Sequence, residues 1–196
     1  MRALPIKEEL QISGGFCLTM AVMLLVLPLD WLLAMAAAGF VHELAHILAV
    51  WLLGGRILSC RISAGGAVIG TSPMESVRQL LCILAGPLGG LALLPLARFL
   101  PKLAVCAFVQ SAYNLLPLFP LDGGRALGCL LELAAGSEKG ERIFLVVQRV
   151  VSVLLAVLGI VCAVSLRLGL LPLLMLIALW GGGKLQKIKN SLQTAA

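Results

Sequence analysis

Two histidines and a glutamate stand close together in the stretch HELAH, residues 42–46, within an apolar run. On a helix, His42 and His46 project from one face one turn apart, so both imidazoles can reach one zinc ion at about 2.0–2.1 Å. Glu43, beside them, can accept the proton of a water molecule that the metal activates. The chain has only these 2 histidines, and ionisable side chains are costly in a lipid-spanning segment. The pattern therefore favours a catalytic metal centre over two histidines that are merely hydrogen-bonded.

A catalytic zinc site usually has three protein ligands, so a third must come from elsewhere. Of the 9 acidic residues, only Asp122 stands in a proline- and glycine-broken segment directly after an apolar run, NLLPLFPLDGG. We expect Gly123 and Gly124 to let the chain turn tightly there, beside a bulky centre. An Asp before two glycines is by itself most often a turn residue or a helix N-cap. In a chain that also carries HELAH, ligation by Asp122 is the favoured interpretation.

The composition indicates an integral membrane protein, because 61% of the 196 residues are hydrophobic, 12% are charged and the mean hydropathy is +1.08. No stretch is long and polar enough for a second domain, so we expect a single one. The six cysteines form no Cys-x-x-Cys pair, and most lie in apolar runs, which predicts small buried side chains rather than ligands or disulfides. They are Cys17, Cys60, Cys82, Cys106, Cys129 and Cys162.

We expect an all-α integral membrane protein with six transmembrane helices and a short membrane-associated β-hairpin after the second helix. The second helix begins at Trp31, with Asp30 as its N-cap, and ends near Gly54 and Gly55. Polar and apolar residues alternate in Ile57–Gly70, and Gly65-Gly66 could supply the hairpin turn. An amphipathic interfacial loop is the alternative for this segment. The other spans are expected at residues 16–27, 80–99, 103–116, 143–165 and 168–180, with a short extra helix at 126–135.

The basic residues orient these spans. With six spans and a cytoplasmic N-terminus, only three basic residues fall outside, and the strong positive-inside bias explains the net charge of +6 without nucleic acid. The three are Arg98, Lys102 and Arg167. In this topology, HELAH and Asp122 both lie towards the cytoplasmic side of the bilayer.

HELAH followed about eighty residues later by NLLPLFPLDGG resembles the site-2 protease family of intramembrane zinc metalloproteases, peptidase family M50. The stage IV sporulation protein FB group is the more similar branch. The resemblance implies one membrane protease domain over 1–196, with its catalytic core at about 31–130. It also implies that His42, His46 and Asp122 bind one Zn²⁺, that Glu43 is the catalytic base, and that Asn114 lies near the substrate.

The third expected span carries AGPLGG, Ala85–Gly90, which resembles the family's Gly-Pro motif. Gly90 stands where the family often has Asn, so close helix packing by Gly86 and Gly90 is the favoured interpretation.

The expected activity is hydrolysis of a peptide bond in or near the transmembrane segment of a membrane-tethered protein. Resemblance suggests a sigma-factor precursor or a remnant signal peptide as substrate, in a bacterial cell membrane, with both termini cytoplasmic. The partners are then the lipid bilayer, that substrate and, as a further option, a regulatory membrane protein, with no nucleic acid. Two alternatives are a metal transporter or channel that uses the same ligands, and a non-catalytic scaffold with a relic site. The intact set of His42, Glu43, His46 and Asp122 argues against the second alternative.

Overall fold

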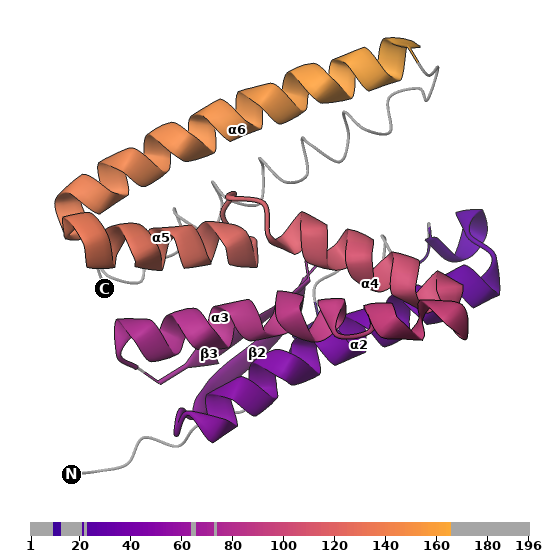
Figure 1. The fold of residues 1–196 in the computed structure, drawn as a ribbon, viewed down its shortest axis with the longest axis horizontal. Coiled ribbons are helices and arrows are strands. Elements are labelled where there is room, and N and C mark those ends of the chain that lie inside the picture. Colours follow the sequence, from indigo (N-terminus) through magenta and orange to yellow (C-terminus); the bar gives the residue numbers. More distant parts are fainter. Residues whose placement is uncertain (1–9, 13–20, 22, 64–65, 73, 166–196) are drawn as a thin grey trace. The chain divides into compact units, whose positions relative to one another are not determined.

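The computed structural model describes residues 10–12, 21, 23–63, 66–72 and 74–165 (Figure 1). The chain divides into two compact units, Met1–Leu115 and Leu116–Ala196. The first unit contains a small sheet and the helices α2 (Leu29–Leu52), α3 (Ser76–Leu91) and α4 (Pro101–Asn114), and the second contains α5 (Asp122–Ala135) and α6 (Ser137–Ser165). A single domain over 1–196 stays a prediction.

The helix that carries HELAH is α2, Leu29–Leu52, which at 24 residues is about 36 Å long. The predicted N-cap at Asp30 is wrong, because the helix begins at Leu29, two residues before the predicted start at Trp31, and Asp30 lies in its first turn. The carboxylate of Asp30 instead pairs with the ammonium group of Lys102. A proline preceding the helix leaves no capping side chain, and an acidic residue in the first turn still complements the helix dipole.

The predicted end of this helix near Gly54 and Gly55 is confirmed. Gly54 has a φ of 77°, and its N–H donates to the carbonyl of Trp51. The N–H of Gly55 donates to the carbonyl of Val50 at 2.8 Å. These two bonds form a Schellman motif, which satisfies the last helical carbonyls before the chain leaves the helix.

Three contacts fix the directions of the helices in the first unit. The Asp30–Lys102 ion pair brings the starts of α2 and α4 (Pro101–Asn114) together, so these two helices run the same way. The helix that lies between them in the sequence, α3 (Ser76–Leu91), runs in the opposite direction, since its Cys82 meets His46 and its Gly89 approaches Ala45. Such alternation is what successive membrane spans require.

The boundaries of α3 differ from those predicted. The helix begins at Ser76, four residues before the predicted start at Leu80, and gives way to the 3-10 helix η1, Leu94–Arg98. Pro95 lies at the start of η1, where its missing N–H leaves no helical bond unmade.

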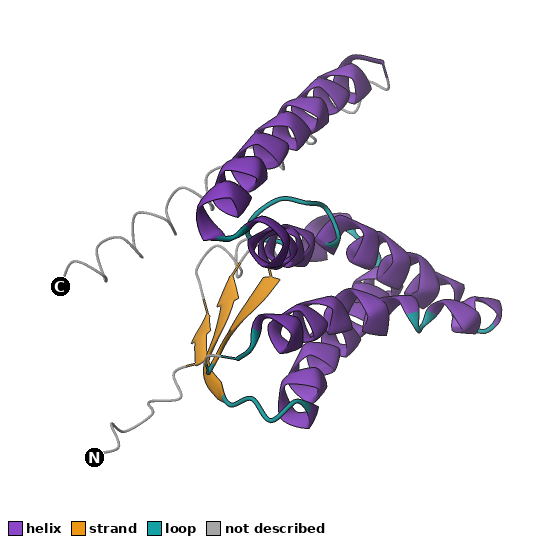
Figure 2. Cartoon of the chain, turned by 60° about the vertical axis from the view of Figure 1, so that its left-hand side comes forward, coloured by secondary structure: helices purple, strands orange, loops and turns teal. Residues whose placement is uncertain are grey.

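The hairpin predicted at Ile57–Gly70 is confirmed as β2 (Ile57–Ser63) and β3 (Gly66–Thr71), which pair antiparallel. The alternation predicted from Ile57 onward is interrupted, because the register shifts between Ile57 and Ser59. A third strand that the sequence did not reveal, β1 (Leu10–Ile12), pairs parallel with β2. The sheet order is β1-β2-β3, so β3 is an edge strand among the described residues (Figure 2).

In the second unit, α5 (Asp122–Ala135) and α6 (Ser137–Ser165) form a helical hairpin. Gly136 joins them with a φ of 79°, a conformation that side chains with a Cβ rarely adopt. The extra helix predicted at 126–135 begins four residues earlier, at Asp122, and the span predicted from Ile143 begins at Ser137.

Three described helices are long and apolar enough to cross a membrane: Leu29–Leu52, Ser76–Arg98 and Ser137–Val161. They correspond to the second, third and fifth predicted spans. The fourth predicted span is present as α4, whose 14 residues extend about 21 Å. The sixth predicted span lies outside the described residues, and of the first, Ala21 and Met23–Val26 are described as helical. Six spans therefore stay a prediction.

Gly54 supplies a test of the end of α2. Replacement by Ala forces a Cβ into a left-handed conformation, although nothing lies within 4 Å of that position. We expect Gly54→Ala to lower the free energy of unfolding by about 1–2 kcal/mol, measured by denaturation in detergent. Gly54→Asn is the matched control and should cost less, because Asn tolerates this conformation. Equal stability of the Ala variant and the unmodified protein would contradict the assignment of the motif.

Candidate metal centre

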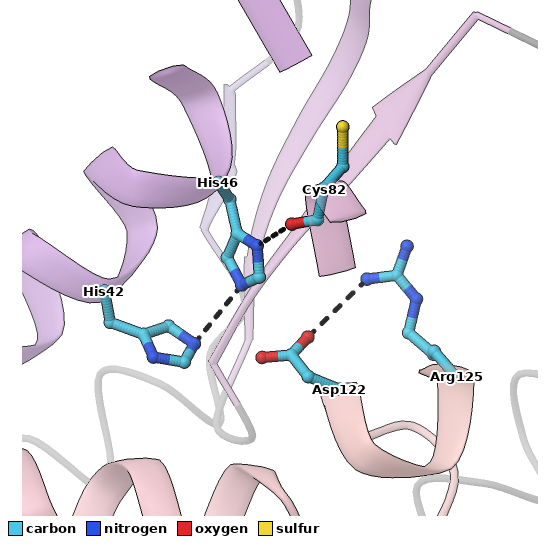
Figure 3. Close-up of polar contacts among 5 residues, drawn as sticks. All are labelled: His42, His46, Cys82, Asp122 and Arg125. Atoms are coloured by element: carbon cyan, nitrogen blue, oxygen red, sulfur yellow. Dashed lines mark hydrogen bonds and ion pairs between the residues drawn. The ribbon is translucent and has the colours of Figure 1, made fainter. Parts of the chain in front are cut away.

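The two predicted histidine ligands lie close together, inside the first unit. His42 is 2% exposed and His46 is half-buried, and their rings meet edge to face with centroids 4.9 Å apart. The two Nε2 atoms are 3.3 Å apart (Figure 3). Two nitrogens that each lie 2.0–2.1 Å from one tetrahedral ion are about 3.3–3.4 Å apart. The imidazoles therefore already have the separation that a shared metal ion demands.

His46 is oriented from the neighbouring helix. Its Nδ1 lies 2.8 Å from the backbone carbonyl oxygen of Cys82 on α3 (Figure 3). A carbonyl oxygen only accepts hydrogen bonds, so Nδ1 carries the proton in this contact. In the neutral ring, Nε2 then has the lone pair, on the side that faces His42. A metal-binding histidine commonly has such a partner on its other nitrogen.

Glu43 follows His42 on α2 and is half-buried. It shares one helical turn with both histidines. The helix therefore supplies two ring nitrogens and one carboxylate within five residues.

Asp122 lies in the second unit as the first residue of α5 and is 7% exposed. The partial positive charge of a helix N-terminus favours a carboxylate there. The guanidinium of Arg125, one turn later, lies 3.9 Å from the carboxylate, which is an ion pair beyond hydrogen-bond distance (Figure 3). Two imidazoles and a carboxylate are donor types that can hold a metal ion.

The tight turn predicted at Gly123 and Gly124 is wrong, because both residues are helical. The chain turns earlier, in Leu116–Leu121, which includes a cis Phe119–Pro120 bond. A Cβ on Gly124 would lie 2.4 Å from the carbonyl carbon of Leu118. The glycine is needed for close approach of this loop to the first turn of α5, next to Asp122.

Asn114 is the last residue of α4 and is half-buried. Its predicted contact with substrate stays a prediction.

The described cysteines agree with their predicted role as small apolar side chains. Cys82 and Cys106 are buried, Cys129 is half-buried, and all three are free thiols. On α5, burial raises the pKa of the Cys129 thiol, Glu132 raises it further, and Arg125 opposes both. A raised pKa keeps the thiol protonated and a poor metal ligand. Cys17 and the side chains of Cys60 and Cys162 lie outside the described residues.

The sequence did not reveal two neighbours of the predicted ligands: Gly86, against the ring of His46, and Arg125, beside Asp122. Packing by Gly86 and Gly90 was predicted from AGPLGG and is confirmed, since both are buried. The partner of Gly86 could have been found only by knowing how α3 runs along α2.

Two comparisons with known proteins found similarities to this chain. A model of the family "Peptidase family M50" matches residues 64–158. This range includes Asn114 and Asp122 and begins after HELAH. The fold is similar to that of a site-2 protease from Methanocaldococcus jannaschii, with a TM-score of 0.69, 20% identity, and coverage of 94% of this chain and 92% of that chain. At that identity the likeness shows a shared fold. No curated protein sequence matches the chain.

The approach of Gly124 to Leu118 can be tested by adding one methyl group. Gly124→Ala should lower the free energy of unfolding by about 1–3 kcal/mol, because the added methyl group overlaps backbone that cannot rotate away. Gly128→Ala is the matched control on the same helix, since nothing lies within 4 Å of its Cβ position. Denaturation in detergent measures both, and equal stability of the two variants would contradict this contact.

Proposed function

We propose that this chain is an intramembrane zinc metalloprotease of the site-2 protease type. It hydrolyses a peptide bond in or near the membrane-spanning segment of a tethered protein. The single observation that carries the proposal is the 3.3 Å separation of the Nε2 atoms of His42 and His46. The match to peptidase family M50 and the fold likeness to a site-2 protease support it.

In this proposal, His42, His46 and Asp122 hold one Zn²⁺. Nitrogen and carboxylate oxygen donors suit zinc, and three protein ligands are typical of catalytic zinc sites. The Cys82 carbonyl and the Arg125 guanidinium are the neighbours of two of these ligands. When bound, the metal acts as a Lewis acid that polarises the scissile carbonyl and makes water more acidic.

Glu43 supplies the proton transfer. Its carboxylate accepts a proton from the attacking water and later delivers it to the leaving amine. This carboxylate lies within one turn of both histidines on an apolar helix, and an ionisable side chain is costly to place there, which supports a functional role. Asn114, at the end of α4, is the proposed contact for substrate near the scissile bond.

The substrate class follows from the location of the site on an apolar helix. A membrane-tethered protein, such as an inactive sigma-factor precursor, presents its cleavage site at that depth. We place the chain in the stage IV sporulation protein FB-like group and in a bacterial cell membrane. Both termini are proposed to be cytoplasmic, and the site is proposed to open towards the cytoplasm, the side on which most basic residues fall in the predicted topology. A regulatory membrane protein is a further proposed partner.

A helical substrate must unwind before its carbonyl can be attacked, and β3 is the element that could hold it extended. Because β1 pairs with the other side of β2, β3 keeps an edge without a neighbouring strand among the described residues. An extended peptide can add to such an edge through main-chain hydrogen bonds. We propose that substrate binds there.

The role of Glu43 is tested by Glu43→Gln, which keeps the size of the side chain and removes the base. We expect cleavage of a tethered substrate in vesicles to fall by roughly 10²–10⁴-fold, with the zinc content of the purified protein unchanged. Cleavage at the original rate would contradict the assignment. Retained metal flux across vesicles, without any cleavage by the original protein, would favour a transporter.

The edge-strand proposal is tested by proline at successive positions of β3, Val68→Pro and Ile69→Pro. Neighbouring residues of a strand direct their N–H groups to opposite sides, so one variant loses a bond to β2 and the other loses a bond to substrate. We expect one variant to be destabilised, and the other to keep its stability and zinc while its cleavage falls. If the stable variant cleaves at the original rate, β3 does not hold the substrate.

A further inference from the structure

Two residues of α3 contact His46: Cys82 through a hydrogen bond, and Gly86 through a close approach that its lack of a side chain allows. The carbonyl of Cys82 accepts the bond from Nδ1 at 2.8 Å. Four residues on, Gly86 is buried, and a Cβ there would lie 2.2 Å from Nε2 of His46. Both contacts come from one face of α3, one turn apart.

We propose that Gly86 and the Cys82 carbonyl act together as positioning groups for His46. They hold the ring as the Nδ1–H tautomer, with the lone pair of Nε2 facing His42. This inference rests on the proposed function, since it gives the reason why α3 is built around a zinc ligand. Neither group touches the substrate.

The absence of a side chain at position 86 makes room for the imidazole and also leaves the Cys82 carbonyl accessible to it. In a helix, each Cβ tilts towards the N-terminus and covers the preceding turn. A Cβ at position 86 would therefore stand over the turn that contains Cys82, at the place where the imidazole now lies. Glycine leaves the Cys82 carbonyl open to a second donor, and a carbonyl oxygen has the two lone pairs to accept it.

The other glycines of this segment meet atoms of a different kind. A Cβ on Gly89 would lie 2.5 Å from the Cβ of Ala45, and one on Gly90 would lie 2.2 Å from Oγ of Ser111. These contacts concern helix packing alone. Gly86 differs because its neighbour is the nitrogen that would bind the metal. Gly89, where an added Cβ would be crowded to a similar degree, supplies the control.

The experiment compares Gly86→Ala and Gly89→Ala, purified in detergent, by competition for Zn²⁺ with a chromophoric chelator. We expect Gly86→Ala to weaken zinc affinity roughly 10- to 100-fold, as loss of a partner of a metal ligand does. Gly89→Ala should lower thermal stability and keep the original affinity. Unchanged affinity in Gly86→Ala, or an equal loss in both variants, would overturn the proposal.

A second measurement needs no folded glycine variant and no metal. The chain contains 2 histidines, so His42→Gln leaves His46 as the only imidazole for ¹⁵N NMR of the metal-free protein. We expect the Nδ1–H tautomer, and the Nε2–H tautomer would overturn the proposal. If the original protein binds no zinc, the proposed function fails, and the tautomer still decides whether α3 positions this ring.

Discussion

The close approach of α3 to α2 at His46 is the interaction on which the candidate site depends. An imidazole fills the space that a side chain at Gly86 would occupy, and its Nδ1 donates to the Cys82 carbonyl. This contact leaves Nε2 directed at the matching nitrogen of His42, 3.3 Å away. A ring free to rotate would lose this alignment, and with it much of the affinity for a metal. In the proposed function, Gly86 on α3 therefore positions a metal ligand in addition to allowing the two helices to pack closely.

The distribution of ionisable residues on α2 agrees with the cost of placing such groups in lipid. The helix α2 is apolar apart from Asp30 and the HELAH residues, and its outward side chains such as Phe40 and Trp51 are exposed. At its start, Asp30 pairs with Lys102, whose ammonium group also lies 5.6 Å from the centroid of the Trp31 ring. Tryptophan is enriched at membrane–water interfaces. His42 and His46 lie more than ten residues further along α2, and ionisable residues within such an apolar helix point to a functional site.

Much of this arrangement could be predicted from the sequence, because it is local. The spacing of His42 and His46 fixes their shared face, and Gly54 and Gly55 mark the end of their helix. The hairpin followed from alternation and a glycine pair. Non-local features could not be predicted: β1 is a short strand whose pairing with β2 depends on the folded chain. Gly123 and Gly124 suggested a turn, since glycine allows one, yet they are helical, and Gly124 serves an approach to Leu118 that only the fold creates. The approach of Gly86 to His46 could not be predicted either, because it depends on how α3 packs against α2.

The account's central claim is that His42, His46 and Asp122 hold one zinc ion, and X-ray absorption at the zinc edge of the purified protein tests it most directly. The account predicts one zinc per chain, with nitrogen and oxygen neighbours at about 2.0–2.1 Å, two of them from imidazole. It also predicts that Asp122→Ala lowers the zinc content of the purified protein. A protein without zinc, or a shell of sulfur at about 2.3 Å, would contradict it.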